Sequence, residues 1–262
     1  MHGYSAREAV RLADQASTLA RLLHEGVRYP PESLVLECGC GTGAQTILLA
    51  TRNPAARIVS LDRSPASLAL ARSRVETAGI RNVQFQAADL FQLPFEDESF
   101  DHVFVCFVLE HLRQPLEALQ HIRRVLRASG SITAIEGDHG SWYCHPQTAE
   151  ASRTVECLVE LQARMGGDAL IGRRVYPLLA AAGYRDIEVT PRMVYVDDAR
   201  PDLVEGFSRN TFIAMVEGVR PQAIAAGLID PAAWDKGIAD LYRAAEPGGT
   251  FCYTFFKGVA RR

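Results

Sequence analysis

The sequence lacks the features that mark several large classes of protein. Among its 262 residues, 28 are Lys or Arg and 31 are Asp or Glu, so the net charge is −3. A chain without an excess of basic residues has no electrostatic footprint for nucleic acid, and we expect none as its main partner. No apolar run near the N-terminus is long enough for a signal peptide or a membrane span, which predicts a cytoplasmic protein.

Cysteines are few, scattered and ungrouped. The chain has six of them and no Cys-x-x-Cys pair, so the sequence predicts no zinc site and no metal. In a chain of this size we expect the thiols to be reduced and buried. Cys38 and Cys40 lie inside a glycine-rich motif, where we expect them to pack as small apolar side chains.

The glycine-rich motif Val35–Gly43 is the most informative segment that the chain does have. It reads V-L-E-C-G-C-G-T-G, which is typical of a buried parallel strand running into a tight turn and a helix. Its three glycines have no Cβ and tolerate positive φ, so the backbone can approach a ligand closely. Asp62 follows the next predicted strand, Ile58–Leu61, where an acid is placed to bind a ribose. The pattern predicts a nucleoside-containing cofactor.

Charge favours one such cofactor over another. Glu37 stands two residues before the first glycine, where a carboxylate would disfavour the pyrophosphate of a dinucleotide. S-adenosylmethionine (SAM) carries a sulfonium and an ammonium instead, and an acid favours both. The spacing Gly39-x-Gly41-x-x-Ala44 also fits the dinucleotide fingerprint loosely, so an NAD-type oxidoreductase stays as an alternative. A glycine-rich turn without any ligand is the structural alternative.

Strands and helices alternate through the first half of the chain. Short connections between them predict a doubly wound, mostly parallel sheet with right-handed crossovers. After Glu136 the alternation stops, and helical segments follow. We expect strands at about 34–38, 57–61, 83–87, 101–107, 131–136, 185–190 and 251–259, and helices at about 146–165, 172–182 and within an insert at 201–246.

The same pattern predicts three regions. Apolar residues recur at helical spacing over residues 5–25, with Ser5 and Glu8 as a capping box, so residues 1–29 are predicted to form a helical lid. Residues 30–139 are predicted to form the cofactor-binding core. Residues 140–262 are predicted to complete the core and to carry helical inserts on the substrate side.

Four blocks occur in an order and spacing that together are specific, namely Val35–Gly43, Ile58–Asp62, Gln86–Leu90 and Phe100–His111. On these blocks the chain resembles the class I SAM-dependent methyltransferases, in the group that includes ubiquinone and menaquinone C-methyltransferases. The resemblance covers residues 30–137, and the final strand more weakly. It implies an α/β Rossmann-like methyltransferase fold with a seven-stranded sheet and helical insertions near the C-terminal half.

The resemblance also implies a set of cofactor contacts. Asp62 would hold the ribose hydroxyls and Asp89 the adenine amino group, although each acid has an alternative role as a helix or loop cap. The remaining implied contacts are Glu37, Gly39, Cys40 and Gly41 at the methionine end of SAM, Arg63 and Leu90 at the adenine, and Cys106 and Phe107 beside the methionyl part. If the N-terminal helix closes over the cofactor, Tyr4 and Arg7 would reach its charged end.

Acceptor-side residues are harder to predict, because transfer from SAM needs alignment more than a fixed catalytic group. A proton acceptor is needed only when the acceptor is a poorly acidic OH, NH or CH. Asp138 and His139 are our candidates for this role, with a structural loop joining core and insert as the alternative. His111, after the fourth strand, is a third catalytic candidate with a structural alternative. The predicted substrate-side residues are Glu136, Asp138, His139, Tyr143, Arg192 and Tyr195.

The predicted function is therefore methyl transfer from SAM to N, O, C or S of a small-molecule metabolite by in-line displacement. Cys106-Phe107-Val108-Leu109 stands where the family's nucleobase-amine enzymes carry Asn-Pro-Pro-Tyr or Asp-Pro-Pro-Tyr, and no Pro-Cys nucleophile is present. The alternatives are an RNA or protein methyltransferase, for which a basic face is expected, and a non-catalytic SAM-binding protein. The sequence leaves open whether copies of the chain form a homo-oligomer.

Overall fold

A computed structural model describes residue 16 and residues 18–262. The strands of this part of the chain form one sheet in the order β3-β2-β1-β4-β5-β8-β6, with β7 paired to β8. The first five strands in that order run parallel, and β8 is antiparallel to β5, β6 and β7. The strands are β1 Leu34–Cys38, β2 Arg57–Asp62, β3 Val83–Ala87, β4 Phe100–Cys106, β5 Leu126–Gly137, β6 Tyr143–His145, β7 Arg185–Val196 and β8 Thr250–Arg261.

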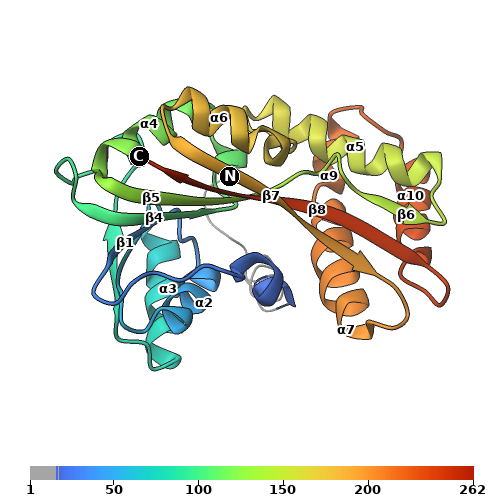
Figure 1. The fold of residues 1–262 in the computed structure, drawn as a ribbon. Coiled ribbons are helices and arrows are strands. Elements are labelled where there is room, and N and C mark those ends of the chain that lie inside the picture. The colour runs from blue at the N-terminus through green and yellow to red at the C-terminus, as the bar shows by residue number, and fades with distance from the viewer. Residues whose placement is uncertain (1–15, 17) are drawn as a thin grey trace.

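Helices cover both faces of the sheet, as in a doubly wound fold. In Figure 1 the helices α2 and α3 lie below the sheet and α4 and α6 lie above it, while the C-terminal helices gather at the far end of β8. The helical elements are α2 Ala44–Arg52, α3 Pro65–Thr77, η1 Leu109–His111, α4 Pro115–Val125, α5 Ala149–Arg164, η2 Ile171–Arg174, α6 Val175–Ala181, α7 Pro201–Leu203, η3 Val204–Ile213, α8 Ala214–Glu217, α9 Arg220–Ala225 and α10 Pro231–Arg243.

This architecture confirms the predicted α/β class, with one more strand than the seven expected. The addition is β6, whose three residues pair with Thr250–Cys252 at the start of β8. Strand β8 reaches past β5 at that end, so a short piece of the predicted loop can pair with it. The predicted N-terminal lid falls largely outside the described residues, but residues 18–24 are helical.

Helix starts follow local capping chemistry. Ser64 precedes Pro65 and accepts a hydrogen bond from the Ser67 N–H at the first turn of α3. Thr148 caps α5 in the same way, accepting from the Ala151 N–H, and Asp230 caps α10 ahead of Pro231. Each side chain satisfies an N–H group that has no partner within its own helix, so these sequence signals determine where the helices begin.

Strand β5 begins earlier than predicted. The predicted start was at about residue 131, but β5 already starts at Leu126 and pairs there with Phe100. The register shifts between Phe100 and His102, which accommodates a β-bulge. A Cβ on Gly130 would lie 2.9 Å from the carbonyl oxygens of Arg127 and Asp101, so the glycine is required by this close approach rather than by a helix end.

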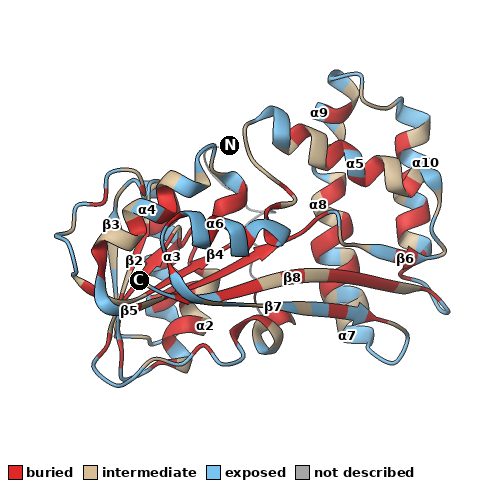
Figure 2. Cartoon of the chain, turned by 45° about the horizontal axis from the view of Figure 1, so that its top comes forward, coloured by how far each residue is buried: buried red, intermediate tan, exposed pale blue. Residues whose placement is uncertain are grey.

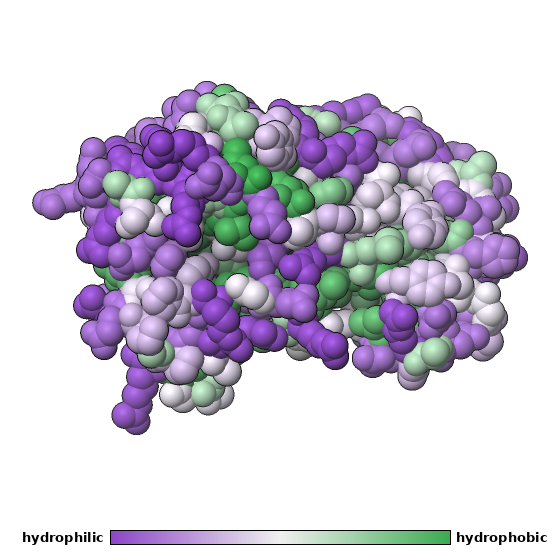
Figure 3. Space-filling view, in the orientation of Figure 1, coloured by the Kyte–Doolittle hydropathy of each residue, from purple (hydrophilic) through white to green (hydrophobic). Residues whose placement is uncertain are grey.

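Two hydrophobic clusters fill the space on either side of the sheet. One contains Leu36, Val105 and Ile132 and lies under α4 and α6. The other contains Val35, Phe104 and the aromatic residues of β8, and Leu19 and Leu23 of the N-terminal helical segment belong to it. Figure 2 shows the buried residues running along the central strands, and Figure 3 shows that hydrophilic side chains predominate on one face of the molecule.

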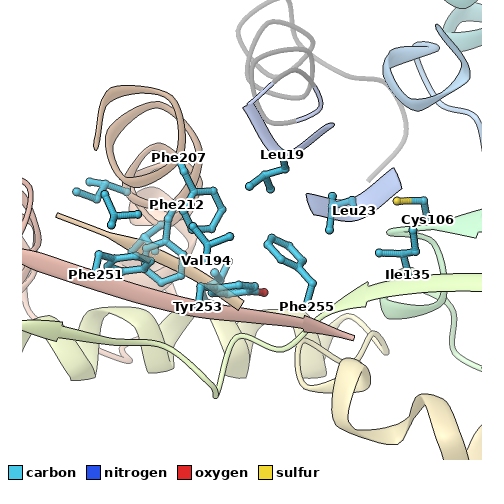
Figure 4. Close-up of a cluster of buried hydrophobic side chains, with 14 of the residues drawn as sticks. Leu19, Leu23, Cys106, Ile135, Val194, Phe207, Phe212, Phe251, Tyr253 and Phe255 are labelled. Atoms are coloured by element: carbon cyan, nitrogen blue, oxygen red, sulfur yellow. The ribbon is translucent and has the colours of Figure 1, made fainter. Parts of the chain in front are cut away.

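The predicted C-terminal helical insert contains an unusual element. Residues Val204–Ile213 form a π-helix, in which the Thr211 hydroxyl donates to the Gly206 carbonyl five residues earlier, at 2.7 Å. A Cβ on Gly206 would lie 2.5 Å from the Thr18 hydroxyl, so this helix packs directly against the N-terminal segment. π-helices are rare and frequently occur at functional sites. This one places Phe207 and Phe212 against β8 (Figure 4).

The insert should contribute strongly to stability through Trp234 of α10, whose side chain is 1% exposed. We expect Trp234→Ala to lower the free energy of unfolding by about 3–5 kcal/mol, because it removes a large buried ring and leaves a cavity. Denaturant unfolding measures this loss. Tyr176→Ala is the matched control, since this ring is 56% exposed and its loss should change stability by less than about 0.5 kcal/mol. Equal losses in both variants would contradict the packing assigned to α10.

Candidate active site at the carboxyl ends of the parallel strands

The glycine turn after β1 has the backbone geometry that the motif predicts. Gly39, Gly41 and Gly43 have φ values of 70°, 51° and 82°, all in the left-handed region. A Cβ on Gly39 would lie 2.7 Å from Val108, so the turn packs closely against the segment after β4. Gly43 makes a similar approach to Ala71 of α3. The turn is therefore held between β4 and α3, and only glycine fits it without strain.

Asp62 joins this turn to the start of α3. One carboxylate oxygen accepts the Gly41 N–H at 2.9 Å, and the other accepts the Ser64 N–H at 2.8 Å. The side chain thus shapes two loops that meet at the carboxyl ends of β1 and β2. Neither contact tests the ribose role, which stays a prediction.

Glu37 is buried beneath the turn. It is 2% exposed, and one of its carboxyl oxygens accepts hydrogen bonds from Thr46 at 2.7 Å and from Ser60 at 2.6 Å. Burial raises the pKa of Glu37 to about 7, against an opposing effect of the two hydroxyl groups, and the negative charge of Asp62 raises it further. A cation bound at the turn would stabilise the carboxylate, so this site is suited to a positively charged ligand.

The predicted adenine contacts lie at the end of β3. Asp89 is exposed and its side chain accepts the Phe91 N–H at 2.9 Å, which is the loop-capping role considered for it. Leu90 is buried, and Arg63 is exposed after β2. Parallel pairing of Asp62 with Ala87 brings these residues to the same edge of the sheet. Their contacts with a cofactor stay predictions.

Glu136 connects β5 to the segment after β4. Cys106 ends β4, and Phe107 follows with a φ of 58°, which is strained for a residue with a side chain. The N–H groups of Val108 and Leu109 both donate to one carboxyl oxygen of Glu136, at 3.0 and 2.8 Å. The other oxygen of Glu136 is buried without a hydrogen-bond partner. Burial, and then the neighbouring Glu110, raise the pKa of Glu136 to about 8.

His139 lies in a buried polar chain just beyond β5. Its Nδ1 is 2.7 Å from the Tyr253 hydroxyl, and its Nε2 is 3.7 Å from a carboxylate oxygen of Glu110. Gln162 of α5 donates to the same Glu110 oxygen at 3.2 Å. The structure therefore places His139 in a buried group of hydrogen-bonding side chains, and its role as a proton acceptor stays a prediction.

Asp138 has a different environment from its neighbour. Its two carboxylate oxygens accept hydrogen bonds from Nε and one terminal nitrogen of Arg173, at 2.8 and 2.9 Å. One of them also accepts the Gly140 N–H at 3.0 Å. These are the contacts of a residue that fixes the loop to η2, as the structural alternative expects. The catalytic and substrate roles predicted for Asp138 are not tested by them.

The remaining predicted side chains lie toward the surface. The His111 side chain is 61% exposed and lies 3.6 Å from Glu110. Tyr143 and Tyr195 flank Cys252 on the outer side of β8 and are both exposed. Arg192 donates to Glu25 at 2.6 Å. His111 lies near the same Glu110 carboxylate as His139. The structure does not bring Tyr143, Tyr195 and Arg192 together with His139. Tyr4 and Arg7 lie outside the described residues.

Aromatic rings line the sheet between the turn after β4 and the C-terminal insert. The ring of Phe107 lies 5.5 Å from that of Phe255, and Phe255 lies 4.7 Å from Tyr253, measured between centroids. Phe207 contacts both rings of β8 from the π-helix. Figure 4 shows Phe207 of the π-helix facing Tyr253 and Phe255 of β8. We call Phe107, Phe207, Phe212, Phe251, Tyr253 and Phe255 the aromatic cluster.

Comparisons with known proteins point to the same class of protein as the sequence blocks. Residues 36–134 match the family model described as a methyltransferase domain. An uncharacterized protein of a Streptomyces fradiae transposon is 31% identical over 210 residues, which cover 79% of this chain and 60% of that protein. The demethylmenaquinone methyltransferase of Thermus thermophilus is 35% identical over 102 residues, or 39% of this chain and 46% of that enzyme. The chain thus spans about half the length of these curated relatives.

Residues 36–134 are similar to a methyltransferase domain. This confirms the resemblance seen in the sequence blocks. The methyltransferase fold extends through the whole chain, because the solved structure of the [4+2]-cyclase SpnF aligns with 100% of this chain and 87% of its own, with a TM-score of 0.56. At 20% identity that likeness shows the fold alone.

Sequence reasoning assigned no role to two residues of the buried polar chain that contains His139, namely Glu110 and Tyr253. Glu110 was overlooked beside His111, which was the candidate there. The run Phe251-x-Tyr253-x-Phe255 alternates along the last strand and is a signal that these rings share one face. Within the part of the chain that the structure describes, no group of three or more His, Cys, Asp or Glu side chains is placed to hold a metal ion. No helix of that part is long and apolar enough to cross a bilayer.

Proposed function

We propose that the chain is a methyltransferase that transfers the methyl group of SAM to a small molecule. The observation that supports this most is the position of Glu37, buried directly below the glycine turn. A carboxylate there disfavours the pyrophosphate of NAD and favours the cationic methionine end of SAM. Asp62 stands at the neighbouring strand end, where an acid binds a ribose.

The chain's own residues would act mainly by positioning. SAM supplies the electrophilic methyl group, and the protein aligns the acceptor with the methyl–sulfur bond and keeps water out. The glycine turn and Asp62 would hold the donor at the ends of β1 and β2. Phe107, fixed by the bond from its N–H to the Ile135 carbonyl at 2.9 Å, would separate the donor from the aromatic cluster.

A small-molecule acceptor is favoured over a macromolecule by two features. The candidate acceptor side is built from buried rings and buried polar groups, which suit an enclosed ligand. The net charge of −3 gives no support for an RNA-binding face. A non-methylating role is the second candidate, because a protein with this fold is described as a [4+2]-cyclase. The methylated atom is left open by this proposal.

Calorimetric titration with SAM and with NAD tests the cofactor. We expect SAM to bind and NAD not to bind, and NAD binding in the absence of SAM binding would overturn the proposal. Incubation with labelled SAM and a metabolite extract then tests turnover. Label transferred to a small molecule supports a methyltransferase, whereas SAM binding without transfer to any extract supports the non-methylating role.

Asp62→Asn tests the proposed ribose contact. The amide retains the shape of the side chain but loses its charge and one acceptor, so we expect SAM affinity to fall by about 1–3 kcal/mol. Asp97→Asn is the control, because Asp97 is an exposed acid whose ion-pair partner is Arg124 of α4. An Asp62→Asn variant with the SAM affinity of the wild type would remove Asp62 from the cofactor site.

A further inference from the structure

The side chains of Tyr253, His139 and Glu110 form a buried polar chain next to the aromatic cluster. All three residues are at most 9% exposed. The hydroxyl of Tyr253 and Nδ1 of His139 are 2.7 Å apart, which is a short hydrogen bond, and Glu110 faces the other ring nitrogen. Buried polar chains of this kind are costly to desolvate and gain strength from one another when paired. They are therefore candidates for a role in chemistry.

Every element around His139 contributes a group that bears on its charge. Glu110 comes from η1 and Glu136 from β5, and the unpartnered carboxyl oxygen of Glu136 is buried in the same region. Asp138, next in sequence, is neutralised by Arg173 from η2. The carboxylate of Glu110, which faces Nε2, would stabilise the imidazolium that forms when His139 takes up a proton.

Tyr253 connects this polar chain to the aromatic cluster. Its ring lies 5.8 Å from both Phe207 and Phe212 and 4.7 Å from Phe255. Gly137 permits this placement, because a Cβ there would lie 2.4 Å from the Tyr253 hydroxyl. Burial raises the pKa of Tyr253 well above its ordinary value. The hydroxyl is therefore neutral, and it can donate one hydrogen bond while accepting another.

We propose that Tyr253 contacts the methyl acceptor and that His139, positioned by Glu110, takes up the proton that the acceptor loses. This inference rests on the proposed methyltransferase function. The acceptor atom forms a bond to the methyl carbon while the carbon–sulfur bond breaks and leaves its electron pair on sulfur. The acceptor's proton passes to the Tyr253 oxygen as the original Tyr253 proton moves to Nδ1 of His139. The resulting imidazolium faces Glu110.

We call the proton transfer through Tyr253 to His139 the relay. Measuring the proton uptake when 4-nitrophenol binds tests the relay without knowledge of the natural acceptor. The protein is first saturated with S-adenosylhomocysteine (SAH), and the probe is titrated at a pH at which it is mainly phenolate. Calorimetry in two buffers of different ionisation enthalpy gives the number of protons taken up. We expect the wild type to take up about one proton for each bound probe, because the bound phenolate and His139 share the added proton.

Tyr253→Phe and His139→Gln should abolish this uptake while leaving SAH affinity within about twofold, since neither side chain belongs to the proposed donor site. Tyr253→Phe keeps the ring and hence the packing, so a purely structural role would leave the uptake unchanged. Tyr176→Phe, at an exposed position of α6, is the control and should behave as the wild type. Glu136→Gln should also retain the uptake if His139 is the proton acceptor.

Two results would overturn the relay. One is the wild-type proton uptake in Tyr253→Phe or His139→Gln, and the other is a probe that fails to bind protein saturated with SAH. Failure to bind SAH at all is a separate outcome, which contradicts the proposed function itself. Glu110→Gln provides a further check, because it retains the shape of the positioning residue and should lower the proton uptake without abolishing probe binding.

Discussion

Glu37→Gln should make the ligand-free protein more stable at pH 8 and should weaken SAM binding at the same pH. The folded-state pKa of Glu37 is about 7, above the ordinary value of 4.5, because the side chain is buried. A raised carboxyl pKa contributes stability that is complete below pH 4.5 and is lost as the pH rises through 7. The amide of the variant cannot ionise, so the variant escapes this loss.

The expected difference is about 2–3 kcal/mol between the two proteins at pH 8 and near zero at pH 5. Denaturant unfolding at both pH values measures it, and the comparison between variants cancels the other titrating groups. Glu76→Gln, at an exposed position of α3, is the control and should show no such pH-dependent difference. A difference between Glu37→Gln and wild type that is the same at both pH values would contradict the buried, ionisable state of Glu37.

Bound SAM should act against this difference in stability between the wild type and Glu37→Gln. Its cationic end stabilises the carboxylate of Glu37, so bound SAM should stabilise the wild type more than the variant at pH 8. We expect the affinity of Glu37→Gln for SAM to be lower by roughly tenfold or more, equivalent to about 1.4 kcal/mol. Equal affinities would show that Glu37 contributes to the pH dependence of folding stability and not to the binding of SAM.

Gly39→Ala should cause a large loss of both stability and SAM binding. The residue has a φ of 70°, where an alanine costs about 1–2 kcal/mol. The new Cβ would also lie 2.7 Å from Val108, whose N–H binds Glu136, so the turn after β4 must move. We expect a total loss of about 2–4 kcal/mol in the free energy of unfolding, because overpacking adds to the backbone strain.

Gly79→Ala separates these two causes. Gly79 has nearly the same φ, 69°, but a Cβ there would meet nothing within 4 Å. It should therefore show the backbone cost alone and should leave SAM binding unchanged. Chemical denaturation and SAM titration of both variants provide the comparison. If Gly39→Ala loses no more stability than Gly79→Ala, the close approach of Gly39 to Val108 does not add to the loss of stability.

The sequence was sufficient for the central part of the fold because its signals are local. The glycine turn, the acid after β2 and the strand–helix alternation each depend on neighbouring residues, and β3 was placed at its observed bounds, Val83–Ala87. The last two strands were predicted too short. Residues of β7 beyond Thr190 pair with the part of β8 from Phe251 to Phe256, and the run Met193-Val194-Tyr195-Val196 does not alternate with polar residues.

The acceptor side could not be predicted in the same way, because its partners come from distant segments. Asp138 is a predicted catalytic and substrate-side residue, and nothing in the sequence indicated its pairing with Arg173, 35 residues away. Tyr253 is 114 residues from His139, and only the antiparallel pairing of β5 with β8 brings the two together. Single residue types carry no information about such pairings, so the sequence identified His139 without its two partners.

The bridge from Glu136 to the N–H groups of Val108 and Leu109 limits where this scaffold can diversify. Any replacement in the segment after β4 must keep two amides directed at β5, and a replacement of Glu136 by a residue without a side-chain oxygen leaves them without this acceptor. No comparable pair of hydrogen bonds ties the π-helix Val204–Ile213 to the parallel strands among the described residues. We therefore expect substitutions of Phe207 and Phe212 in the insert to be tolerated more readily than substitutions at the strand ends beneath them.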